Sequence, residues 1–154
     1  MKRILAFLLC LFIGVTAFAQ SAKEIYEEGK KLYEDKKYKE AFVKFSAAAE
    51  TGNKKAQYYL GRCYDKGNGV KEDNNQAFNW YSKSAAQDYA KAQYQLGKCY
   101  KKGKGVAKDE QKAKELYLKA VNNPKGGDKI LPKLKEDAAE GDGIAKEVLK
   151  TIKK

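Results

Sequence analysis

A block of this sequence recurs after 36 residues, and the repeat limits the fold more than any other feature. Residues 56–70 read AQYYLGRCYDKGNGV and residues 92–106 read AQYQLGKCYKKGKGV, without a gap. The same offset relates Phe45 to Tyr81 and Tyr81 to Tyr117. Fixed periods of about 20 to 50 residues are typical of solenoids, in which small units stack on one another. We therefore expect a repeat array.

Each unit has the pattern of two amphipathic helices. Apolar or small residues recur at helical spacing in both halves of a unit, at Ala56, Tyr59, Leu60, Cys63 and Tyr64 and then at Ala77, Trp80, Tyr81, Ser84 and Ala85. Two Gly-x-Gly turns, at 67–69 and 103–105, separate the halves, and Asp73 followed by Gln76 resembles a capping box. Because no stretch alternates with period 2, the sequence predicts an all-α fold, an α-solenoid of tandem helix-turn-helix repeats.

Both blocks contain Ala-x-Tyr-x-Leu-Gly followed by Tyr-x-x-Gly-x-Gly-Val. In these motifs the chain resembles the Sel-one-like (SLR) branch of the tetratricopeptide repeat superfamily, which implies a right-handed solenoid. The preceding segment is similar to the parent tetratricopeptide form, with a shorter turn between its helices; the matching residues are Gly29, Leu32, Tyr33, Tyr38, Ala41, Phe45 and Ala48.

The N-terminal pattern and the repeats together divide the sequence into five predicted segments. They are a signal peptide at 1–19, a tetratricopeptide-like repeat at 20–55, SLR repeats at 56–91 and 92–123, and degenerate, lysine-rich capping helices at 124–154. Within the last segment, Gly141, Ala145 and Leu149 still echo Gly52, Ala56 and Leu60. Terminal repeats of solenoids are usually atypical, because one face must meet water.

The N-terminal residues have the features of an export signal. Met1-Lys2-Arg3 is positively charged, the stretch from Ile4 to Phe18 is apolar, and Ala17-Phe18-Ala19 fits a cleavage site. The stretch is shorter than the roughly 18 residues of a usual membrane span. We expect an exported protein, periplasmic or secreted, with a bacterial envelope preferred. An uncleaved anchor is the alternative.

Composition excludes several function classes. The chain has no histidine, which excludes Ser-His-Asp or Cys-His catalysis and histidine-ligated metals. Its net charge is +12, yet Arg62 is the one arginine after the signal, and lysine lacks the planar fork that reads guanine edges. We expect no sequence-specific nucleic-acid binding, no cofactor and no metal.

Cys63 and Cys99 occupy the same position of consecutive repeats. Both fall on apolar stripes, where cysteine behaves as a small hydrophobic residue. Equivalent residues of stacked repeats lie about 10 Å or more apart, beyond the ~7 Å Cα separation that a disulfide spans. We expect buried thiols; a disulfide in an oxidising compartment is the alternative.

A surface is the best candidate site. In repeats of the family that the chain resembles, the first helix of each unit lines the concave side, and a cation, a tyrosine and a second cation recur there at the start of each of three units. The predicted partner-binding residues are eight of these nine, all except Lys23: Tyr26, Lys30, Lys55, Tyr58, Arg62, Lys91, Tyr94 and Lys98. Tyrosine offers a large amphipathic contact area, and the cations suit carboxylates or phosphates. The tyrosines could alternatively serve packing between repeats, and the lysines could alternatively serve to keep the protein soluble.

Two other motifs have simpler explanations. The Gly-x-Gly turns lack the third glycine or the Gly-Lys-Ser/Thr ending of phosphate-binding loops. Neighbouring acidic residues such as Glu27-Glu28, Glu72-Asp73 and Glu136-Asp137 do not face each other on a helix, and we interpret them as caps and solvated faces.

We therefore predict a non-enzymatic, monomeric scaffold without a membrane span in its mature form, which binds an acidic protein or peptide in a concave groove. The alternative is charge-driven binding of an anionic envelope polymer, such as lipopolysaccharide, cell-wall glycan or nucleic acid. A β-lactam-interacting enzyme is a distant third. Secreted SLR relatives linked to β-lactams carry a disulfide pair in each repeat, whereas this chain has one cysteine per repeat.

Overall fold

The computed structural model describes residues 20–153; the predicted signal peptide at 1–19 lies outside them. Within this range the chain forms α-helices and one short 3-10 helix, and no strand. They are α2 (Ala22–Glu34), α3 (Tyr38–Glu50), α4 (Lys54–Lys66), α5 (Asn74–Ala86), α6 (Ala90–Lys102), α7 (Glu110–Val121), η1 (Gly127–Lys129), α8 (Leu131–Ala139) and α9 (Gly143–Ile152). Over the same residues, no helix is both long enough and apolar enough to cross a membrane.

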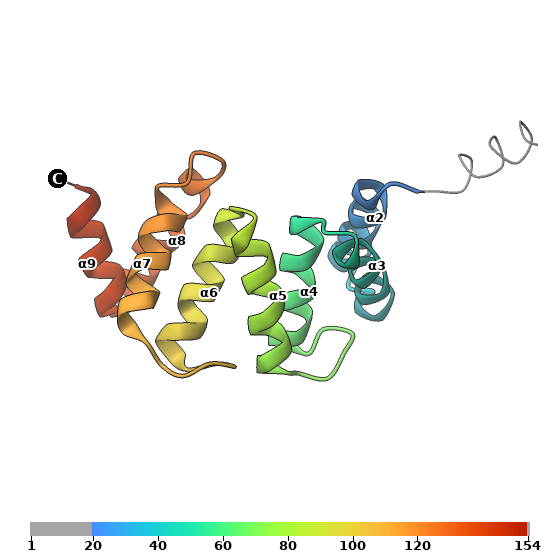
Figure 1. Cartoon of the computed structure of the whole chain (residues 1–154), viewed down its shortest axis with the longest axis horizontal. Helices are drawn as coiled ribbons and strands as arrows, with labels where there is room; N and C mark the ends of the chain where they lie inside the picture. Colours follow the sequence, from blue (N-terminus) through green and yellow to red (C-terminus); the bar gives the residue numbers. More distant parts are fainter. Residues whose placement is uncertain (1–19, 154) are drawn as a thin grey trace, which may run out of the picture.

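The helices form a single row from α2 and α3 at one end to α9 at the other (Figure 1). From α2 to α7, each helix packs against its neighbours in the chain, first within a pair and then against the next pair. The prediction of an all-α solenoid of helical hairpins is confirmed.

Side-chain caps and glycine turns set the ends of these helices. Asp73 caps α5 by accepting hydrogen bonds from the backbone N–H groups of Asn75 and Gln76, at 2.9 and 3.0 Å. The reciprocal capping box is found instead at Ser21 and Glu24, at the start of α2.

The Gly-x-Gly segments are turns that rest on a neighbouring helix. Gly67 ends α4 in the left-handed conformation with φ +66°. A Cβ on Gly69 would lie 2.2 Å from the carbonyl oxygen of Tyr38, and one on Gly105 would lie 2.1 Å from that of Asn74. The second glycine of each turn therefore lets the loop touch the start of the preceding unit's second helix.

In each of the three helix pairs from α2 to α7, a glycine of the first helix packs against an aromatic ring of the second helix. A Cβ on Gly61 would lie 2.7 Å from the ring of Tyr81, and a Cβ on Gly97 would lie equally close, 2.7 Å, to the ring of Tyr117. Both tyrosines are completely buried. Phe45 packs in the same way against Gly29 in the first pair.

The C-terminal helices depart from this regular order. Only residues 51–53 connect α3 to α4, and residues 87–89 connect α5 to α6, whereas residues 122–142 lie between α7 and α9. Yet α9 packs on α7, and Asp142 caps it as Asn53 caps α4. The position of α9 is thus that of the first helix of a further repeat, and η1 and α8 form an insertion before it.

Cys63 and Cys99 are free and buried, as the sequence predicted. Burial raises the pKa of the Cys63 thiol to about 12 and that of the Cys99 thiol to about 11. The two thiols are therefore protonated at neutral pH and poorly reactive.

We expect Gly61→Ala to lower the free energy of unfolding by about 1–3 kcal/mol, because the added methyl group overlaps a buried ring that cannot move away. Gly143→Ala is the matched control, since nothing lies within 4 Å of a Cβ at that position of α9. Urea denaturation measures both. Equal effects of the two substitutions would contradict the packing role of Gly61.

Iodoacetamide at pH 8 should leave both repeat cysteines unmodified in the folded protein and alkylate both in urea, because only the thiolate reacts. Peptide mass spectrometry resolves the two sites. Cysteines that resist alkylation in urea but are alkylated once a reductant is added would instead show a disulfide.

Candidate functional site

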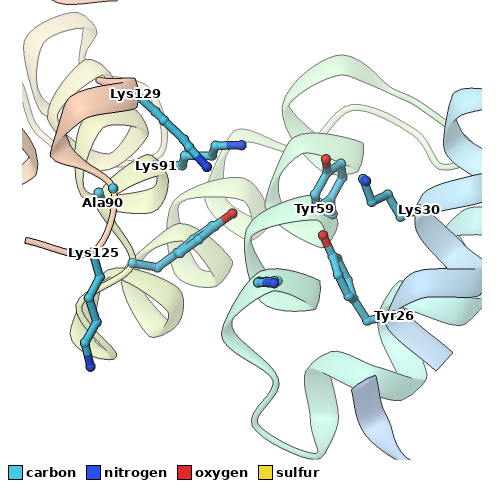
Figure 2. A pocket seen from close by; sticks show the side chains of 10 residues that line it. Tyr26, Lys30, Tyr59, Ala90, Lys91, Lys125 and Lys129 are labelled. Carbon is cyan, nitrogen blue, oxygen red and sulfur yellow. The ribbon is translucent and has the colours of Figure 1, made fainter. Parts of the chain in front are cut away.

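A cavity of about 340 Å³ opens on the face formed by the first helices of the units. Its walls come from α2, α4, α6 and the segment that precedes α8. The lining residues are Tyr26, Lys30, Lys55, Tyr59, Tyr89, Ala90, Lys91, Lys125, Gly126 and Lys129. Figure 2 shows Lys91 and Lys129 on one side of the cavity, across from Tyr26, Lys30 and Tyr59. We call this cavity the basic groove.

The basic groove has a strongly positive potential. Five of its ten lining residues are lysine and three are tyrosine, and none of these ten is acidic. Burial first, and then nearby positive charges, lower the pKa of Lys91; these charges belong to Lys129, Lys133, Arg62 and Lys30. An anion that entered the groove would relieve this repulsion.

Four of the eight predicted binding residues line the basic groove. They are Tyr26, Lys30, Lys55 and Lys91. The ammonium group of Lys55 lies 5.6 Å from the centre of the Tyr26 ring, so that cation and ring from neighbouring units meet as a pair.

The other predicted tyrosines lie between helices rather than along this cavity. Tyr58 is 6% exposed, and its ring contacts the rings of Tyr59, Tyr81 and Tyr89. Tyr94 is 5% exposed and stacks on Tyr117. Their positions are those of packing between and within repeats, which was the alternative role considered for them.

Arg62 lies beside the basic groove in a cluster of aromatic rings. Its guanidinium carbon is 5.4, 6.0 and 5.6 Å from the ring centres of Tyr33, Tyr58 and Tyr59. Tyr59 also lines the groove, so it joins the two sites. Within residues 20–153, no carboxylate lies within ion-pair distance of Arg62.

Lys98 and Tyr94, in contrast, already bind a carboxylate of this chain. The hydroxyl of Tyr94 donates a hydrogen bond to Asp137 on α8, and the ammonium group of Lys98 lies 3.2 Å from the other oxygen of the same carboxylate. Burial and this hydrogen bond raise the pKa of Tyr94 above its usual range. One repeat along the array from Arg62, the equivalent cation is thus neutralised.

Sequence reasoning did not identify six groove residues: Ala90, Gly126 and the four with larger side chains, Tyr59, Tyr89, Lys125 and Lys129. Tyr59 belongs to the apolar stripe of its helix, which predicts packing, and Tyr89 precedes α6, outside the helical pattern. Lys125 and Lys129 belong to the inserted segment, which has no counterpart in the other units and therefore no predictable position.

Three of the neighbouring acidic residues, one from each pair, have structural partners. Glu28 pairs with Lys44 at 2.7 Å, and its hydrogen bonds, first that from Lys44, lower its pKa. Asp73 is a helix cap, and Asp137 is bound by Tyr94 and Lys98.

Residues 54–89 and 90–124 each match the family model of the Sel1 repeat. The chain is a Sel1-repeat protein. Its matched repeats coincide with the helix pairs α4–α5 and α6–α7. Sel1 repeats typically serve as protein-interaction modules. Among curated protein sequences, none matches the chain.

Solved structures support the same family. A Sel1 repeat protein from Oxalobacter formigenes is 37% identical over 73% of this chain and 47% of its own, with a TM-score of 0.61. A protective antigen of uropathogenic Escherichia coli with an SLR fold is 31% identical over 67% of this chain and 23% of its own, with a TM-score of 0.64. Cysteine rich protein B of Helicobacter pylori is 31% identical over 55% of this chain and 63% of its own, with a TM-score of 0.52. This Sel1-repeat protein thus spans less than two thirds of each.

Tyr94→Phe should lower the free energy of unfolding by about 1–3 kcal/mol, because it removes a hydrogen bond to a charged acceptor. Tyr117→Phe is the matched control. The Tyr117 hydroxyl is buried without a hydrogen-bond partner among residues 20–153, so its removal should leave stability unchanged or raise it. Urea denaturation of both variants decides; a destabilised Tyr117→Phe protein would contradict the control's premise.

Proposed function

We propose that this protein is a non-catalytic scaffold whose basic groove binds an acidic segment of a partner protein. The observation that carries the proposal is the lining of the groove, with five lysines, three tyrosines and no acidic residue among the ten. Lysines attract and orient carboxylates, while tyrosine rings provide contact area at a low entropic cost. Such a lining suits a peptide with alternating acidic and apolar side chains.

The organisation that we propose has four parts after the signal peptide. The tetratricopeptide-like repeat at 20–55 contributes Tyr26, Lys30 and Lys55 to the groove, and the SLR repeat at 56–91 contributes Tyr59, Tyr89, Ala90 and Lys91. The capping segment at 124–154 contributes Lys125 and Lys129. We also propose that the protein acts as a monomer in the bacterial envelope, where the apolar N-terminal sequence would direct it.

The excess of lysine also favours a second candidate, the charge-driven binding of an anionic envelope polymer. Such binding follows the total positive charge of the protein and decreases steeply with salt. Groove binding depends on where the charges lie, and the tyrosine contacts make it less sensitive to salt. We do not propose an enzyme, since the groove is lined by lysine, tyrosine, glycine and alanine and presents no evident nucleophile with an activating base.

The test compares two charge-matched triple variants in capture from envelope extract. The groove variant is Lys30→Glu, Lys91→Glu, Lys129→Glu; the control variant changes Lys39, Lys71 and Lys146, which are exposed and outside the groove, to glutamate. A protein partner should be retained by the wild type and the control and be lost at least about tenfold from the groove variant. Circular dichroism confirms that all three are helical.

If the groove variant and the control variant lose captured material equally, and capture by the wild type disappears at moderate salt, the polymer candidate is supported and groove binding is overturned. Retention of the same partner by the groove variant would also overturn it, because the lysines would then have no part in recognition.

A further inference from the structure

The first helices of the units carry a repeated pair of a tyrosine and a cation four residues later, which we call the Tyr–cation array. Asp137 binds its last pair, Tyr94 and Lys98, in the way that a ligand would. It belongs to α8, which lies in the insertion between α7 and α9 and not in the regular order of helices. Its carboxylate accepts from the Tyr94 hydroxyl and from the Lys98 ammonium group. The chain therefore contains an example of what this pair of side chains binds.

The same pair occurs one repeat earlier as Tyr58 and Arg62. In both units the cation lies four residues after the tyrosine and over its ring, at 5.3 Å for Lys98 and 6.0 Å for Arg62. The neighbour of Tyr58 in the equivalent place is Gln95 of α6, a neutral side chain that acts to lower the pKa of the tyrosine. No carboxylate within residues 20–153 neutralises Arg62 as Asp137 neutralises Lys98.

The surroundings of Arg62 favour an anion from outside. Lys30 and Lys91 lie close enough to contribute to the same positive potential, and Tyr59 connects the guanidinium to the cavity. A guanidinium held among aromatic rings keeps its planar N–H groups available for a carboxylate, which they bind in a bidentate manner.

We propose that Arg62 is the position at which an acidic side chain of the partner binds, as Asp137 binds at Lys98. This inference rests on the proposed function and specifies the ligand group. Ile130 and Leu134 are fully buried in the C-terminal core and keep α8 in place. Asp137 therefore remains bound to Lys98, and this position is not available to a partner. The binding array therefore ends at Arg62, and the inserted segment sets its length.

The test uses a peptide of six glutamates with both ends blocked, and the matched glutamine peptide. In ¹H–¹⁵N NMR spectra of the purified protein, the Nε–H signal of Arg62 is identified by its loss in Arg62→Lys. The glutamate peptide should shift this signal and the glutamine peptide should not. Arg62→Gln should weaken the affinity for the glutamate peptide about tenfold or more, in line with the loss of one charge-assisted hydrogen bond.

Two further variants test the equivalence with Asp137. Gln95→Glu places a carboxylate near Tyr58, whose ring lies under Arg62, and should weaken binding of the glutamate peptide, whereas Gln95→Met should not. Asp137→Asn releases the charge of Lys98 and should strengthen binding about threefold. A glutamine peptide with a free C-terminus and inorganic phosphate distinguish an acidic side chain from a terminal carboxylate or a simple anion.

The outcomes separate this proposal from the function on which it rests. Binding of the glutamate peptide that is lost in the triple groove variant but unchanged in Arg62→Gln would overturn the assignment of Arg62 and leave groove binding intact. Absence of any Arg62 shift at saturating peptide would do the same. If the triple groove variant and Arg62→Gln both still bind the glutamate peptide as the wild type does, groove binding and the assignment of Arg62 are both overturned.

Discussion

The close approach of a glycine to an aromatic ring is the contact on which this array depends. At Gly61 and Gly97 the first helix of a Sel1 repeat comes so near the second that only a hydrogen atom fits above the ring of Tyr81 or Tyr117. Both rings are fully buried, so each contact sets the separation of its two helices with little freedom. Because every unit packs on the one before it, this separation also sets the spacing of the first helices, and hence of the groove walls.

The tyrosines of the first helices serve packing and the groove to different degrees. Tyr58 and Tyr94 are buried among neighbouring aromatic rings, whereas Tyr26 combines burial with a place in the groove lining. The cations next to them differ in their partners: Asp137 neutralises Lys98, whereas no carboxylate in the described part of the chain, residues 20–153, neutralises Arg62. One repeated sequence motif thus gives a filled position at one unit and an open one at another.

Much of the architecture could be predicted from the sequence, because the repeat imposes it. The 36-residue offset, the helical stripes and the glycine turns indicated an all-α array, and the equivalence of Cys63 and Cys99 indicated two core thiols. The site was less predictable. Periodicity identifies which residues are equivalent, but it does not say whether a tyrosine at such a position contacts solvent or the next helix, and the segment with Lys125 and Lys129 has no equivalent at all.

The sequence by itself determined the repeat, the helix boundaries set by caps and glycines, and the positive charge of the first-helix face, because these follow from local spacing and composition. The echo of Gly52, Ala56 and Leu60 in the last segment pointed to a further first helix, but only the tertiary structure decided that α8 folds beside α6. It also decided which cation of the array has no carboxylate partner among the residues that the structure describes. Those outcomes depend on contacts between segments some forty residues apart, such as Tyr94 with Asp137, and no local pattern encodes such a pairing.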